Sequence, residues 1–257
     1  MSRFSNLEFG DESEGLSENE PILKDEAYFL AEANTAFENG KFEHGLRAYA
    51  KVLEFNPKNA IAWTGQVRML IELKEFREAK LWADKALESF PHESELLAAK
   101  AVALGRIGDL KAALAFSDAS IEERGNTPYI WLARADVLLA RKEKRAEFCF
   151  NKALALAPRD WFFHWLASRI YFFYEKFSLA LQMIQRALSL DSGRGIIWLQ
   201  LGYCQSALGL VSEAENSFEQ VQQLDPSCSE AEIALKKLPE VGSWTRIRHI
   251  WRRLFSW

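Results

Sequence analysis

A period of 34 residues runs through most of this chain, and it constrains the fold more than any other feature. A residue that ends a helix recurs at Pro57, Pro91, Gly125, Pro158, Ser192 and Pro226. A small residue recurs at Gly45, Ala79, Ala113, Ala146, Ala180 and Ala214. Both series advance in steps of 34 residues, with a single step of 33. A fixed period of this length indicates one supersecondary unit that is stacked several times.

A third series opens each unit with a bulky residue: Phe29, Trp63, Leu97, Trp131, His164 and Trp198. A slimmer residue follows four positions later: Ala33, Val67, Ala101, Ala135, Ser168 and Gly202. Small residues let two helices approach closely, because the distance between helix axes follows side-chain size. The bulky residues, His164 among them, are expected to fill the space between units. The 33-residue step predicts a deletion between the two helices of the fourth unit, within residues 140–145.

The pattern resembles the tetratricopeptide repeat, in which Trp, Leu-Gly, Tyr, Ala, Phe, Ala and Pro hold fixed positions. The sixth unit shows this pattern best, with Trp198, Leu201, Gly202, Ala214, Phe218 and Pro226. The first unit shows Phe29, Ala33, Gly40, Phe42, Gly45, Tyr49 and Pro57, and the third departs most. The resemblance covers about residues 24–228. It implies an all-α fold, a right-handed α-α superhelix of about six helix-turn-helix units with a concave inner face.

Three segments are expected along the chain. Residues 1–23 are acidic and polar and are expected to be disordered. Residues 24–238 are expected to form the solenoid, which an amphipathic helix at residues 229–238 caps. Gly40, Gly108 and Gly209 fall between paired helices, where a left-handed turn residue is favoured. Residues 239–257 are expected to form a linker and a basic amphipathic helix.

The predicted C-terminal helix separates apolar from basic side chains completely on a helical wheel. Its defining residues are Trp244, Ile247, Arg248, Trp251, Arg252, Leu254 and Phe255. A cationic helix with Trp and Phe on its apolar face is typical of membrane interfaces. Three interpretations stay open: docking on this chain's own solenoid, anchoring on an anionic membrane, and insertion into another protein or a second copy.

In tetratricopeptide proteins the first helix of each unit lines the concave face and contacts the ligand. The resemblance therefore places a partner-binding groove on units four to six, at Leu132, Asp136, Leu139, Phe162, Trp165, Arg169, Phe172, Leu199 and Tyr203. Units one to three offer smaller or mixed side chains at these positions. Aromatic residues and Arg dominate binding hot spots, so an apolar or helical segment of a partner protein or peptide is expected there. For Phe172, packing between units is the alternative.

The carboxylate clamp that some family members use is not expected here. Asn34 matches one clamp position, but Leu30 replaces the first Lys. Ala98 and Val102 stand where the third inner helix would supply cations.

The sequence contains no catalytic or metal-binding motif, so we expect neither enzyme activity nor a cofactor. A net charge of −4 argues against nucleic acid as a partner. Three cysteines without a close pair, and no apolar leader or membrane-spanning run, indicate a cytoplasmic protein. The sequence therefore predicts a protein-binding scaffold or adaptor. The alternative is a peripheral membrane organiser, held at the inner face of a membrane by the C-terminal helix.

Overall fold

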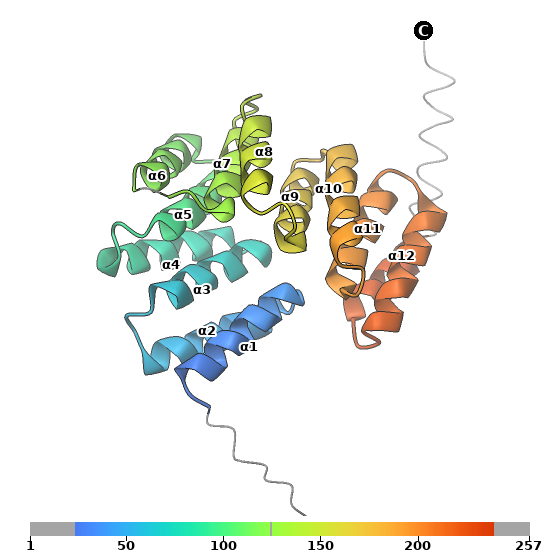
Figure 1. The fold of residues 1–257 in the computed structure, drawn as a ribbon, viewed down its shortest axis with the longest axis horizontal. Coiled ribbons are helices and arrows are strands. Elements are labelled where there is room, and N and C mark those ends of the chain that lie inside the picture. The colour runs from blue at the N-terminus through green and yellow to red at the C-terminus, as the bar shows by residue number, and fades with distance from the viewer. Residues whose placement is uncertain (1–23, 124, 239–257) are drawn as a thin grey trace, which may run out of the picture.

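The computed structural model describes residues 24–123 and 125–238, and every regular element in these residues is a helix. The helices pair into six units, which are stacked side by side along the chain (Figure 1). Their bounds are α1 (Glu26–Glu38) and α2 (Phe42–Phe55), α3 (Ala60–Glu72) and α4 (Phe76–Ser89), α5 (Ser94–Ile107) and α6 (Leu110–Glu122), α7 (Pro128–Ala140) and α8 (Ala146–Leu156), α9 (Trp161–Phe173) and α10 (Phe177–Leu190), and α11 (Gly195–Ala207) and α12 (Val211–Leu224). The predicted superhelix of six units is confirmed.

Residues 229–238 are helical and cap the sixth unit, as the sequence predicts. Ala234 and Leu238 of this helix are buried against Ala214 and Phe218 of α12. The apolar face that a last unit would otherwise expose is thereby covered. The predicted acidic segment (residues 1–23) and basic amphipathic helix (residues 243–257) lie outside the described residues. No helix among the described residues is long and apolar enough to cross a membrane.

The turn inside each unit places one residue in the left-handed backbone region. Glycine holds this position in three units, at Gly40, Gly108 and Gly209, with φ between 71° and 94°. Lys74, Lys142 and Glu175 hold it in the other three, with φ of 66°, 59° and 57°. Only glycine adopts this conformation without steric cost. The 33-residue step falls after Lys142, which confirms the predicted deletion in the fourth unit.

Small residues at the helix crossings let large rings fill the interior. A side chain on Gly202 would meet the ring of Phe218 at 2.5 Å, and one on Gly65 would meet the ring of Tyr49 at 2.3 Å. His164 is 6% exposed and packs where other units place Trp, as the sequence predicts. Its Nε2 lies 3.4 Å from the Pro158 carbonyl oxygen. The Trp198 indole donates an equivalent hydrogen bond to the Ser192 carbonyl, at 2.8 Å.

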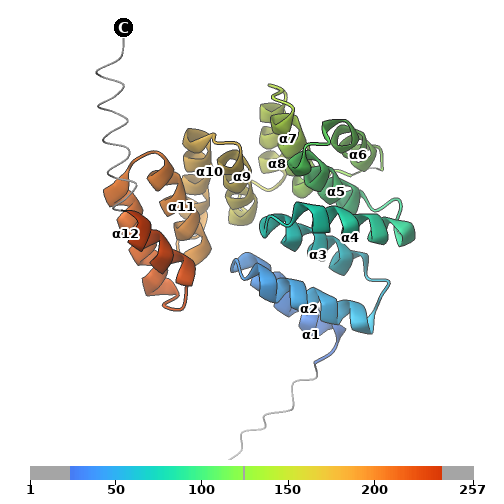
Figure 2. The ribbon, with the colours of Figure 1, turned by 180° about the vertical axis from the view of Figure 1, so that it is seen from behind.

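The superhelix curves until its first unit contacts its fifth and sixth units. Both ribbon views show α1 and α2 beside the ends of α9 and α11 (Figures 1 and 2). Arg194 donates a hydrogen bond to Glu38 at 3.0 Å, and Lys41 forms an ion pair with Asp225 at 3.8 Å. The Phe37 and Phe162 rings meet edge to face, with centroids 5.2 Å apart. We call this contact the seam.

A cavity in the concave face as the candidate functional site

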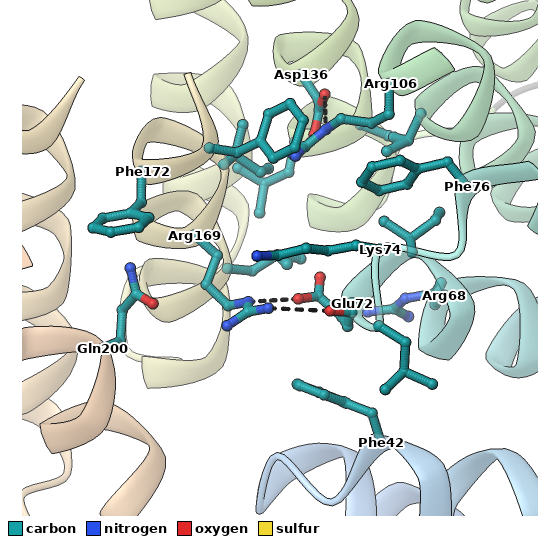
Figure 3. A pocket seen from close by; sticks show the side chains of 18 of the residues that line it. Phe42, Arg68, Glu72, Lys74, Phe76, Arg106, Asp136, Arg169, Phe172 and Gln200 are labelled. Atoms are coloured by element: carbon teal, nitrogen blue, oxygen red, sulfur yellow. Dashed lines mark hydrogen bonds and ion pairs between the residues drawn. The ribbon is translucent and has the colours of Figure 1, made fainter. Parts of the chain in front are cut away.

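The seam turns the concave face into a cavity of about 790 Å³ (Figure 3). All six units contribute inner-helix residues to its wall, and the first and second units add the turn-side residues Phe42, Lys74 and Phe76. Phe172 and Phe173 close it from α9, and Gln200 and Tyr203 line it from α11. The capping helix contributes Glu230. Residues almost two hundred positions apart in the sequence therefore share one wall.

A buried charge network crosses the cavity wall between α5 and α7. Arg106 donates to both carboxylate oxygens of Asp136, at distances from 2.5 to 3.2 Å, and the Tyr174 hydroxyl donates to the same carboxylate at 2.7 Å. Burial disfavours the charged form of Arg106, but the Asp136 carboxylate outweighs it and raises the pKa of Arg106. Burial, followed by the charge of Asp136, raises the pKa of Tyr174. Asp136 is therefore fully engaged within the protein.

A second ion pair joins the two halves of the chain across the cavity. Arg169 of α9 donates to the Glu72 carboxylate at 2.5 Å and to the Glu72 carbonyl oxygen at 3.4 Å (Figure 3). The guanidinium also lies over the rings of Phe42 and Trp165, at 5.5 and 5.2 Å from their centroids. Because both charges are compensated, Arg169 serves the closed shape of the solenoid.

Arg68 of α3 joins its own unit to three others through aromatic contacts. Its guanidinium lies 4.9 Å from the Phe37 ring, 4.0 Å from the Tyr129 ring and 6.0 Å from the Phe162 ring. The Arg68 Nε is buried without a hydrogen-bond partner among the described residues, as is the Trp165 indole nitrogen. Buried donors without acceptors cost free energy, so the closed solenoid leaves two hydrogen-bond donors near the seam unpaired.

Three charged side chains of the cavity wall remain uncompensated within the described part of the chain. They are Lys74, Glu175 and Glu230, each of which is exposed and forms no ion pair with another described residue. Glu230 lies near Tyr203, whose pKa rises to about 12, mainly through burial and further through the Glu230 charge. The open charges of the cavity therefore lie on its rim, at two intra-unit turns and the cap.

The structure brings only part of the predicted groove to this cavity. Leu132, Asp136, Arg169, Phe172 and Tyr203 line it. Leu139 packs against the core, and Leu199 packs against the cluster beneath the cap. Phe162 faces a smaller neighbouring cavity, of about 340 Å³, together with Phe37 and Arg68.

Trp165 corrects the expectation of an open aromatic groove, because it is 0% exposed. The first unit covers its ring with Phe42, whose centroid lies 6.4 Å away. The first three units also supply more of the cavity than the sequence indicated, including Phe42, Phe76 and Arg106. These residues lie near the ends of helices, and they face the centre only because the first unit of the solenoid contacts the fifth and sixth. No sequence signal marks that closure.

The His, Cys, Asp and Glu side chains of the described residues are dispersed. Nowhere in residues 24–123 and 125–238 do three or more His, Cys, Asp or Glu side chains come together as a metal site. Cys149 and Cys204 are buried, and burial raises the pKa of Cys204 to about 11, so its thiol stays protonated and unreactive.

Comparisons with known proteins identify the family. A tetratricopeptide repeat family model matches residues 12–159, more than half of the chain, and a second matches residues 196–228. The chain belongs to the tetratricopeptide repeat family. Among curated proteins, the CTR9 homolog protein of Arabidopsis thaliana is 33% identical over 110 residues, which make up 42% of this chain and 10% of that protein. The matched segment thus spans about a tenth of the relative's length.

Solved structures confirm the fold. A tetratricopeptide repeat protein from Parabacteroides merdae has a TM-score of 0.54 at 19% identity, over 85% of this chain and 86% of that one. The structure of the APC/C hetero-tetramer Cut9-Hcn1 has a TM-score of 0.51 at 14% identity, over 83% of this chain and 43% of that one. At these identities the likeness extends to the helical solenoid alone.

Proposed function

We propose that this chain is a protein-binding scaffold that takes a segment of a partner protein into the central cavity. A volume of about 790 Å³ lies within the usual range of ligand pockets, roughly 300–1,000 Å³. The cavity therefore has room for a few side chains of a partner, and less than a whole helix fits inside it. This proposal refines the groove that the sequence places on units four to six.

The observation that carries the proposal is the combination of accessible rings and uncompensated charges on one concave wall. Phe172 and Tyr203 are only partly buried, although each has a neighbouring ring within 6.5 Å. Phe173 is 38% exposed at the same cavity. Exposed apolar surface next to free charges is typical of a surface that binds another molecule.

The closed seam decides which part of the concave face a partner can reach. The first unit already occupies the surface around Phe162 and Trp165, in the position where a partner helix would lie in an open solenoid. The cavity is the part that stays accessible without opening the ring. The buried titratable groups around it are engaged with one another, as in the Arg106–Asp136–Tyr174 network, which fits binding better than catalysis.

Selection from a random peptide display library against the full chain tests this proposal. The variant Phe172→Ala/Tyr203→Ala removes both rings from the cavity and serves as the counter-target. Leu81→Ala and Phe148→Ala are matched controls, because these side chains are 60% and 64% exposed and lie outside the cavity. We expect enriched peptides that bind the wild type and both controls but not the cavity variant. Equal binding to all four proteins would place the binding surface elsewhere.

A second candidate function rests on the C-terminal sequence. The complete separation of apolar and basic side chains in residues 243–257 favours a scaffold attached to an anionic membrane. Co-sedimentation with phosphatidylserine-containing vesicles tests it, with full-length protein compared with a chain that ends at Glu240. Salt-sensitive pelleting of the full-length protein alone would support the anchor. Equal behaviour of the two proteins would exclude it.

A further inference from the structure

One wall of the cavity combines aromatic rings with free carboxylates and a free amide oxygen. We call it the acidic wall and define it by Phe172, Glu175, Phe177, Gln200, Tyr203 and Glu230. The Phe172 ring lies 5.2 Å from that of Phe177 and 6.5 Å from that of Tyr203, at interplanar angles of 59° and 48°. Tilted rings of this kind present their negative faces to a cation.

Gln200 adds a hydrogen-bond acceptor that nothing in the described structure uses. The residue is 3% exposed, and its amide nitrogen donates to Ser168 at 3.3 Å. Its Oε1 accepts no hydrogen bond from any residue of the described ranges. Figure 3 shows the amide at the cavity wall between Phe172 and Arg169. The free Oε1 can accept a hydrogen bond from a ligand N–H that enters the cavity.

Glu175 occupies its place at a conformational cost. Its φ of 57° lies in the region that Gly40, Gly108 and Gly209 occupy in other units. A residue with a Cβ costs about 1 kcal/mol more than glycine in this region. Lys74 and Lys142 take the same conformation at the corresponding turns of the second and fourth units. In the fifth unit, this turn places a carboxylate on the acidic wall.

We propose that the acidic wall binds one arginine or lysine side chain of the partner segment. The cation lies against the rings of Phe172 and Tyr203, Glu175 and Glu230 balance its charge, and Gln200 Oε1 accepts a hydrogen bond from it. This inference rests on the proposed function and names the chemistry of the partner. Every group that it uses is a π face or an acceptor, which is what a guanidinium or ammonium group requires.

The cations near the acidic wall limit this subsite to a single positive charge. Arg169 and Arg106 are compensated by Glu72 and Asp136. Lys74 is not compensated by a described residue, and Figure 3 shows its side chain extending across the cavity towards Arg169. A ligand with one cation is therefore favoured over a polybasic one. Removal of the Lys74 charge is expected to strengthen the binding of a cation.

Titration of the full chain with N-acetyl-arginine N-methylamide, followed by NMR at the Gln200 side-chain amide, tests the subsite directly. The neutral citrulline analogue is the matched control ligand. We expect a saturable shift with the arginine compound only. The Glu175→Gln/Glu230→Gln variant is expected to bind roughly five- to tenfold more weakly, and Lys74→Ala severalfold more tightly. Glu219→Gln removes an exposed carboxylate away from the cavity and is expected to bind like the wild type.

Equal responses to arginine and citrulline, or unchanged binding in the double variant, would overturn the inference. The peptide selection separates this failure from failure of the proposed function. Enriched peptides that depend on Phe172 and Tyr203 but carry no Arg or Lys would leave the scaffold intact and refute the cationic subsite. If no peptide is enriched, the arginine titration still decides whether the acidic wall binds a cation.

Discussion

Arg169 in the fifth unit donates hydrogen bonds to the side chain and the backbone carbonyl of Glu72 in the second unit, 97 residues earlier in the chain. In an ideal solenoid each unit contacts only its neighbours. Here the curvature brings distant units together, so the concave face becomes a cavity with a closed seam. Much of what this chain can bind follows from that contact.

Loss of the Arg169–Glu72 pair is expected to destabilise the closed ring. Glu72→Gln leaves the guanidinium, which is 26% exposed, without its counter-charge. We expect the free energy of unfolding to fall by about 1–2 kcal/mol, as measured by urea denaturation. Small-angle scattering should show a larger radius of gyration. Lys51→Gln, which breaks the exposed pair with Glu54, is the control and should leave both quantities nearly unchanged.

A disulfide across the seam is expected to form readily. A Cβ placed on Gly40 would lie 3.9 Å from the Cβ of Ile196, a separation that suits a disulfide. In a Cys228→Ser background, Gly40→Cys/Ile196→Cys should cross-link under mild oxidation. The free energy of unfolding should rise by about 1–3 kcal/mol, because a disulfide contributes about 2–4 kcal/mol and a side chain at the positive φ of position 40 costs about 1 kcal/mol. Mobility on non-reducing gels and melting with and without reductant measure this. If the pair resists oxidation while the protein stays folded, the ring is open in solution.

Asp136 is expected to be a structural residue, because Arg106 and Tyr174 use its carboxylate. Asp136→Asn leaves the Arg106 charge buried and unpaired, so we expect a loss of about 3–5 kcal/mol in urea unfolding. The double variant Arg106→Met/Asp136→Leu removes both charges and should recover most of that loss. A loss below about 1 kcal/mol for Asp136→Asn would contradict this role.

His164 is expected to make stability depend on pH. Burial lowers its pKa below the ordinary value of 6.5, so the unfolded chain binds a proton more readily than the folded one. Stability is therefore full above pH 6.5 and falls as the pH drops from 6.5 towards the folded pKa. His164→Trp restores the residue that other units carry and should reduce this dependence in melting curves between pH 5 and 8.

The exposed His92 supplies the control for that measurement. Its side chain is 77% exposed and pairs with Glu123 at 2.7 Å, so His92→Gln removes a histidine without changing the packed interior. If His164→Trp melts with the same pH profile as the wild type, another group is responsible for the loss of stability in acid.

The repeat architecture followed from the sequence because its causes are local. Ala79 and Ala113 at helix crossings, Pro57 at a unit's end and Gly40 in a turn each act within a few residues of their own position. For the same reason, the sequence located the deletion within residues 140–145 and predicted that His164 is packed between units. Periodic signals of this kind determine the number of units, their boundaries and the face of each helix that is buried.

The contact between the first unit and the last two units, which closes the solenoid, was decided by tertiary structure alone. Small rotations between successive units add up over the whole chain, and no single residue encodes their sum. That sum buried Trp165 against Phe42, paired Arg169 with Glu72, and moved the accessible surface from a long aromatic groove to a cavity. The repeat pattern therefore determined which residues face inwards, and the accumulated curvature determined which of them a partner can reach.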